Sequence, residues 1–135
     1  MREVFADACY WVAMIHPKDE LHDAAIQAKD NLGNCVLLTT DEVLTEFLTL
    51  MGTRGQMFRR NAAETVRTLM NNPNIRILPQ TRDSFIQAMK RYEQNQDKKY
   101  SLVDCASMNA MDNANITEVL THDHHFKQAG YTILM

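Results

Sequence analysis

The sequence predicts an α/β protein of three layers, in which helices cover both faces of a mostly parallel sheet of about five strands. Short apolar runs alternate with longer amphipathic segments along all 135 residues, and this alternation is typical of strands joined by helices. The length suits a single domain, residues 1–135, with one hydrophobic core. We find no repeat, low-complexity tract or long linker that would divide the chain.

The expected strands are short apolar runs, at positions 3–6, 35–38, 75–78, 117–120 and 131–134. The expected helices place apolar side chains three or four residues apart, at positions 9–14, 19–32, 41–52, 56–71, 82–95, 102–113 and 123–128. Gly52 and Gly55 interrupt the helical pattern, so residues 41–71 are predicted to form a helical hairpin.

Two helix starts have the spacing of a capping box, in which the first side chain and the one three residues later bond to each other's backbone. These pairs are Thr39 with Glu42 and Ser101 with Asp104. The helix at positions 82–95 is expected to bury a short apolar stripe, formed by Phe85, Met89 and Tyr92.

The composition excludes several classes of protein. An apolar fraction of 45% argues against disorder, and no apolar run approaches the roughly 20 residues that span a bilayer. The N-terminus does not have the pattern of a signal peptide. The three cysteines form no C-x-x-C pair, which favours reduced thiols and a cytoplasmic location. A net charge of −3 argues against tight non-specific binding to nucleic acid, but not against a nucleic-acid enzyme that uses a metal.

Four acidic residues lie in apolar surroundings, where an unpaired carboxylate is costly to bury. Asp7 and Asp123 come just after predicted strands, Glu46 lies on the edge of an apolar helix face, and Asp104 lies in the first turn of a helix. Ligand sites of parallel sheets form beyond the carboxyl ends of the strands, so these side chains can converge there. Converging carboxylates require a cation, and hard divalent cations prefer oxygen ligands.

Each acid also has a purely structural interpretation. Asp7 and Asp123 can cap the helices that follow them, and Asp104 can act only as the partner of Ser101 in a capping box. Glu46 can remain solvated at the edge of its face, although its long side chain can also reach into a cleft. The functional interpretation rests on the combination of the four acids and on their order along the chain.

That combination resembles the PIN-domain nucleases, and most closely the VapC-like toxins of toxin–antitoxin pairs. The similar stretches are residues 4–7, 39–46, 100–105 and 120–126, and the resemblance extends over essentially the whole chain. It implies that Asp7, Glu46, Asp104 and Asp123 bind Mg²⁺ or Mn²⁺ and catalyse hydrolysis. Thr121 matches a small hydroxyl residue that supports the acids, and Ser101 is a second candidate for such support.

The resemblance further implies a metal-dependent endoribonuclease that cuts single-stranded or loop RNA. A small antitoxin and a second copy of the chain are the implied protein partners, and no membrane is involved. One departure concerns Ala8 and Cys9, which stand where many relatives have a hydroxyl or amide side chain near the metal site. The candidate RNA contacts are basic residues near the cleft, namely Arg54, Arg59, Arg60, Arg67, Arg82, Lys90, Arg91, Lys98 and Lys99. For most of them, keeping the protein soluble is the simpler role.

Three alternatives stay open at this stage. A nuclease of the same fold could act in RNA maturation or decay without an antitoxin. A PIN-like protein could only bind partners, although the presence of all four acids argues against this. A Mg²⁺-binding receiver-like module would need a Lys after its last strand, and the chain ends Ile133-Leu134-Met135. Of the neighbouring histidines, we expect His124 at the surface and His125 in a packing role rather than in a metal site.

Overall fold

A computed structural model describes residues 1–135 and contains one sheet of five parallel strands. The strands are β1 (Arg2–Ala6), β2 (Cys35–Thr40), β3 (Ile75–Leu78), β4 (Glu118–Leu120) and β5 (Thr132–Ile133). The helices are α1 (Ala8–Ile15), α2 (His22–Leu32), α3 (Asp41–Gly52), α4 (Gln56–Met70), α5 (Arg82–Gln94), α6 (Leu102–Asn113) and α7 (His124–Gln128).

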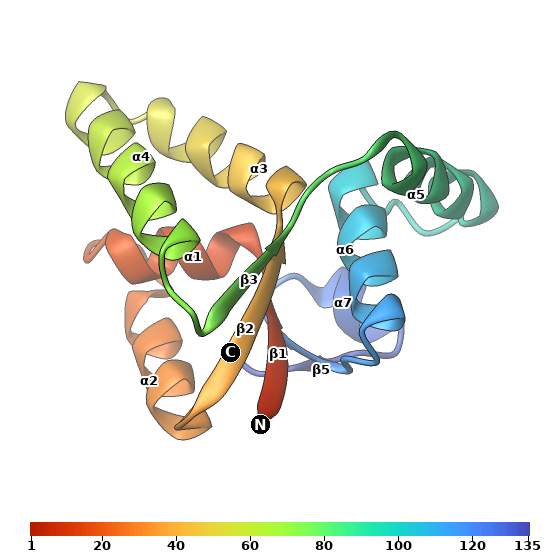
Figure 1. Cartoon of the computed structure of the whole chain (residues 1–135), viewed down its shortest axis with the longest axis horizontal. Coiled ribbons are helices and arrows are strands. Elements are labelled where there is room, and N and C mark those ends of the chain that lie inside the picture. Colours follow the sequence, from red (N-terminus) through yellow and green to blue (C-terminus); the bar gives the residue numbers. More distant parts are fainter.

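The helices cover both faces of the sheet. In Figure 1 the sheet separates α1, α2 and α4 from α5, α6 and α7, while α3 and α4 form the predicted hairpin. The three-layer parallel fold is therefore confirmed, and every predicted strand and helix is present, with differences only at the ends. None of the helices is both long enough and apolar enough to cross a membrane.

The sheet has the order β3-β2-β1-β4-β5, which places β1 at its centre. Val4, Phe5 and Ala6 are fully buried, because helices cover both faces of this strand. Ala6 lies beside Leu120 of β4, and the amide of the next residue, Asp7, donates to the Leu120 carbonyl at 3.1 Å. The carboxyl ends of β1 and β4 therefore meet at one edge of the sheet.

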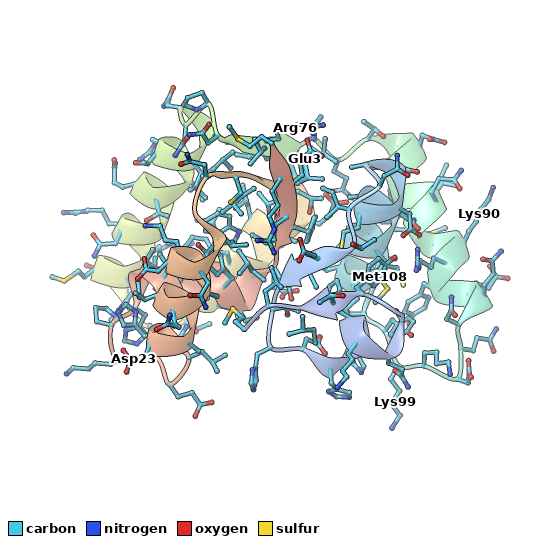
Figure 2. All side chains as sticks on the ribbon, turned by 90° about the horizontal axis from the view of Figure 1, so that it is seen from below. Glu3, Asp23, Arg76, Lys90, Lys99 and Met108 are labelled. Atoms are coloured by element: carbon cyan, nitrogen blue, oxygen red, sulfur yellow. The ribbon has the colours of Figure 1, made fainter.

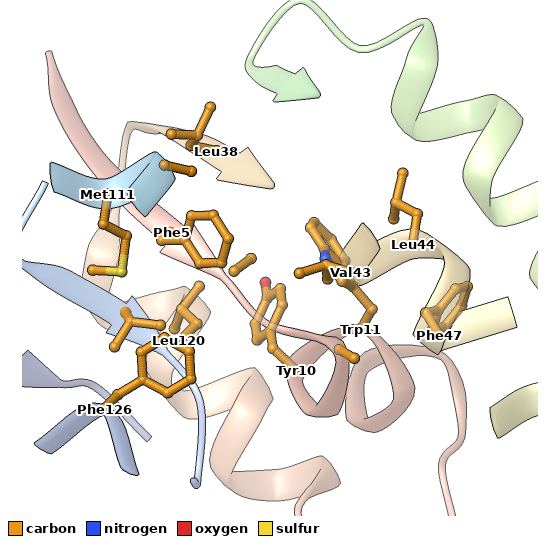
Figure 3. Close-up of a cluster of buried hydrophobic side chains, with 14 of the residues drawn as sticks. Phe5, Tyr10, Trp11, Leu38, Val43, Leu44, Phe47, Met111, Leu120 and Phe126 are labelled. Carbon is orange, nitrogen blue, oxygen red and sulfur yellow. The ribbon is translucent and has the colours of Figure 1, made fainter. Parts of the chain in front are cut away.

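The hydrophobic core joins the central strands to the helices on both sides. Figure 3 shows the aromatic and aliphatic side chains that fill it: Phe5, Tyr10, Trp11, Leu38, Val43, Leu44, Phe47, Met111, Leu120 and Phe126. At the surface, the Glu3 and Arg76 side chains in Figure 2 form an ion pair with a closest N–O distance of 3.0 Å. Since Glu3 is on β1 and Arg76 on β3, this pair bridges the strand between them.

Two local predictions are wrong. Thr40, rather than Thr39, caps the N-terminus of α3, and its hydroxyl accepts from the Val43 amide at 3.1 Å. Strand β2 extends two residues further than predicted, so Thr39 still belongs to the sheet, where its buried hydroxyl donates to the Ala6 carbonyl at 3.0 Å.

The predicted stripe on α5 is also mostly exposed. Met89 and Tyr92 keep 45% and 55% of their surface in solvent, and Ala88 is the buried residue of the helix. The physical reason is that α5 packs against α6 at the outside of the molecule, as Figure 1 shows, and it does not cover the sheet directly.

Candidate active site

Asp7 lies at the carboxyl end of β1, directly before α1. It occupies the N-cap position of α1, but its side chain makes no capping hydrogen bond. Its Oδ2 instead accepts from the hydroxyl of Thr121 at 2.9 Å, and the side chain is buried. Burial raises the pKa of Asp7 from 3.8 to about 6, while hydrogen bonds from Ala8 and Thr121 act in the opposite direction.

Asp104 is held by the predicted capping box at the start of α6. Its amide donates to Ser101 Oγ at 2.9 Å, and its Oδ2 accepts from the Ser101 amide at 3.1 Å. Burial raises the pKa of Asp104, and the neighbouring Asp123 raises it further. Asp104 can therefore cap α6 and also take part in a functional site, because the capping box orients its carboxylate while leaving it near other acids.

Asp123 lies after β4 and caps α7. Its Oδ1 accepts from the His125 amide at 2.9 Å, and its own amide donates to Thr121 Oγ1 at 3.1 Å. Thr121 is fully buried. Its hydroxyl donates to the Asp7 side chain and accepts from the Asp123 amide. One hydroxyl thus connects the two acids that follow adjacent strands.

Glu46 reaches the same region from α3 and is half-buried. Burial is the largest cause of its raised pKa, followed by the negative charges of three other acids: Asp7, Asp104 and Asp123. Like charges raise the pKa of a carboxyl group only when they lie near it. Glu46 therefore lies in the same region as the three aspartates, while the ligand atoms that lie within 4.8 Å of one another belong to Asp104, Asp123 and His125.

His125 was not expected to contribute to this cluster. Its Nδ1 lies 3.4 Å from Asp104 Oδ2 and 3.3 Å from Asp123 Oδ1. Nδ1 is buried and has no hydrogen-bond partner, and ligand atoms of these three residues all lie within 4.8 Å of one another. The ring does pack edge-on against Tyr100, but a packing role alone does not describe its position. The available sequence signal was its place two residues after Asp123, in the first turn of α7.

Cys9 contacts the support beneath the acids. Its Sγ lies 3.4 Å from Thr121 Oγ1 and accepts from the His122 amide at 3.4 Å. The thiol thus lies against Thr121, which bonds directly to Asp7. The departure at Ala8 and Cys9 therefore leaves a weak hydrogen-bonding group in this region.

The candidate RNA-contacting residues differ in how far their side chains are engaged within the protein. Arg91 binds Asp112 with a closest N–O distance of 2.9 Å and contacts Tyr131, so its side chain links α5 to α6 and to the C-terminal segment. Lys90 and Lys99 are exposed and extend away from the ribbon in Figure 2. Lys99 lies in the segment that leads to Asp104, close to the acidic cluster along the chain.

The donor groups fit a divalent cation. Carboxylate oxygens suit hard divalent ions, and the buried Nδ1 of His125, which has no hydrogen-bond partner, lies within 3.4 Å of carboxylate oxygens of Asp104 and Asp123. Burial is the largest cause of the raised pKa values of Asp7, Glu46 and Asp104, and no Lys or Arg side chain forms an ion pair with any of them. A bound cation would balance their negative charges, and such an acidic cluster is suited to hydrolysis of phosphate esters.

A parallel α/β fold with a cluster of acids at the carboxyl edge of its sheet is an arrangement that can serve a metal-dependent nuclease. The chain belongs to the PIN domain family, whose model matches residues 4–130. The prediction of a VapC-like PIN nuclease is thereby confirmed, together with its structural similarity to a toxin of that type.

That toxin is VapC20 of Mycobacterium tuberculosis, described as cleaving the sarcin–ricin loop. It is 27% identical, the match covers 96% of each chain, and the TM-score is 0.85. FitAcB of Neisseria gonorrhoeae is 14% identical over 98% of this chain and 96% of its own, with a TM-score of 0.66, and shares the fold. No curated protein sequence gave a significant match.

Proposed function

We propose that this protein is a divalent-cation-dependent endoribonuclease and that Asp7, Glu46, Asp104 and Asp123 form its catalytic site. The observation that carries the proposal is geometric: Thr121 Oγ1 bonds the Asp7 side chain and the Asp123 amide, and carboxylate oxygens of Asp104 and Asp123 lie 3.4 and 3.3 Å from His125 Nδ1. The charges of all three aspartates also raise the pKa of Glu46, after burial. The family membership and the similarity to VapC20 support RNA as the substrate. A structured or single-stranded RNA loop is the substrate class that this similarity favours.

In the proposed mechanism, Asp7, Asp104 and Asp123 would hold Mg²⁺ or Mn²⁺, and Glu46 would orient the attacking water. A cation bound there would supply positive charge to neutralise the scissile phosphate and to activate water. Thr121 keeps Asp7 in one orientation, and Ser101 does the same for Asp104. Because hydrogen bonds already fix these carboxylates in position, they need little rearrangement during the reaction. This preorganisation is how the protein would increase the rate.

We also propose that the protein acts as the toxin of a toxin–antitoxin pair, with a small antitoxin and a second copy of itself as partners. The similarity to the toxin VapC20 supports the biological role. The test of this role is to measure the growth of cells after induced expression of the protein, alone and together with a candidate antitoxin. Arrest by the wild type but not by Asp104→Asn would support the role, whereas unaffected growth with active enzyme would favour RNA maturation or decay.

The activity is tested with purified protein and a labelled RNA that contains a loop. We expect cleavage with Mg²⁺ or Mn²⁺, none with EDTA, and none with Asp104→Asn. Asp30→Asn is the matched control, because Asp30 is exposed on α2 and outside the acidic cluster. Cleavage that survives both EDTA and Asp104→Asn would overturn the proposed catalytic site.

A further inference from the structure

The Nδ1 atom of His125 lies in an unusual environment. It is buried and accepts no hydrogen bond, yet carboxylate oxygens of Asp104 and Asp123 lie 3.4 and 3.3 Å away. A polar atom buried without a partner is costly, so a fold that keeps one needs a reason for it. The atom faces negatively charged oxygens, and a cation between them would give all three a common partner.

The separations suit shared coordination. Two donors at right angles around a cation with bonds of about 2.1 Å lie about 3 Å apart. The two distances from His125 Nδ1 exceed this only slightly, and the whole set of donor atoms lies within 4.8 Å. A small contraction around an ion would therefore be enough to close the site.

The position of the imidazole ring is also determined by its neighbours. The His125 amide donates to Asp123 Oδ1 at 2.9 Å, so the same carboxylate that faces Nδ1 also holds the His125 backbone. The ring packs edge-on against Tyr100 at a centroid distance of 5.7 Å, and Tyr100 is itself buried. Such packing limits rotation of the ring and keeps Nδ1 close to the carboxylates of Asp104 and Asp123.

We propose that His125 is a metal ligand, which with Asp104 and Asp123 makes a mixed nitrogen and oxygen site that favours transition-metal ions such as Mn²⁺ over Mg²⁺. The inference rests on the proposed function, since it concerns the cation of the same catalytic site. An imidazole nitrogen suits transition metals better than it suits Mg²⁺, which prefers oxygen ligands. Loss of the ring should therefore weaken Mn²⁺ binding more than Mg²⁺ binding.

The test uses the metal-free full chain loaded with Mn²⁺ and examined by pulsed electron paramagnetic resonance. We expect a nitrogen hyperfine coupling in the wild type, altered when the protein contains isotopically labelled histidine. The coupling should be absent in His125→Ala and His125→Gln, and retained in His124→Ala. His124 is the matched control, because it is the adjacent histidine and is exposed.

Calorimetric titration provides the second readout. His125→Ala should bind Mn²⁺ at least about tenfold more weakly, with a smaller change for Mg²⁺, whereas His124→Ala should bind both ions like the wild type. Absence of a nitrogen coupling in wild-type protein that binds Mn²⁺ and cuts RNA would overturn this inference and leave the proposed function intact. Failure of the wild type to bind either ion or to cut RNA would overturn both.

Discussion

The hydroxyl of Thr121 donates to Asp7 Oδ2 at 2.9 Å and so joins the ends of strands β4 and β1 within the acidic cluster. The same oxygen accepts from the amide of Asp123 at 3.1 Å. Both interactions are shielded from solvent, since Thr121 is fully buried and Asp7 nearly so. Thr121 is therefore placed to set the relative positions of two proposed metal ligands.

Replacement of Thr121 by Val should remove this link while keeping the shape of the side chain. We expect affinity for Mn²⁺ and Mg²⁺ to fall by about 10- to 100-fold, because the hydrogen bond that orients a ligating carboxylate is lost. Thr121→Ser keeps the hydroxyl and should stay close to the wild type. Calorimetric titration of the two variants checks this, and wild-type affinity in Thr121→Val would show that Asp7 needs no such support.

The metal-free protein should become less stable as the pH rises from about 4 to about 6.5. The folded state raises the pKa of Asp7 from 3.8 to about 6, chiefly through burial, so in this range it binds a proton that the unfolded chain releases. The stabilisation is complete below the unfolded value and is lost as the pH passes the folded value. For Asp7 the loss amounts to roughly 2–3 kcal/mol. Urea unfolding in EDTA across this range measures it.

Asp7→Asn is the control for the pH effect, because asparagine cannot ionise and can still accept from Thr121. The free energy of unfolding of this variant should depend less on pH, and at pH 7 it should exceed that of the metal-free wild type. Glu46 and Asp104 also have raised pKa values, so part of the dependence will remain. Equal slopes for the two proteins would mean that Asp7 titrates normally.

The sequence predicts the fold and the positions of three proposed site residues, Asp7, Asp104 and Asp123, because both depend on short-range patterns, whereas Glu46 lies in the second turn of α3 and its position depends on how that helix packs. Alternating strands and helices define the parallel sheet, and acids placed after strands or in first turns must lie near its carboxyl edge. The capping box between Ser101 and Asp104 is likewise local and is confirmed. These features need no knowledge of how the helices pack.

The features that the sequence does not predict depend on packing between distant segments. His125 faces Asp104 only because α7 lies against α6, which no local spacing reveals. Similarly, the exposure of Met89 and Tyr92 follows from the outer position of α5, because an apolar stripe alone does not reveal how deeply its helix is buried. The capping-box spacing predicts Thr39 as a helix cap, whereas pairing with β3 keeps Thr39 in the sheet and extends β2 to Thr40.

Ser107 offers a prediction about stability. Its side chain on α6 is fully buried, and its hydroxyl has no hydrogen-bond partner. Ser107→Ala removes the unsatisfied group and introduces a better helix former, so we expect a gain of about 0.5–1.5 kcal/mol in the free energy of unfolding. Ser101→Ala at the start of the same helix should instead cost about 1 kcal/mol, because Ser101 caps α6.

Urea denaturation of both serine variants measures these changes under the same conditions. The opposite signs distinguish removal of an unsatisfied hydroxyl from removal of a bonded one. A loss of stability in Ser107→Ala would show that its hydroxyl binds a group, such as an internal water, that contributes to the fold.

Arg91, Asp112 and Tyr131 form the contact that holds α5 against the rest of the protein. Arg91 donates to Asp112 Oδ2 at 2.9 Å and to the Tyr131 hydroxyl at 3.2 Å, and that hydroxyl donates to Asp112 Oδ1 at 2.6 Å. Arg91→Met keeps the aliphatic stem but leaves these partners without the guanidinium group. We expect a loss of about 1–2 kcal/mol, measured as a shift in the urea midpoint.

A double-mutant cycle with Tyr131→Phe tests whether these residues act as a unit. Tyr131 is almost fully buried and Arg91 is mostly so, so the combined variant should lose less than the two single losses added together. Arg67→Met provides the comparison, because the Arg67–Glu64 pair is exposed on α4 and should contribute nothing measurable. Strictly additive losses at positions 91 and 131 would mean that the two side chains stabilise α5 independently.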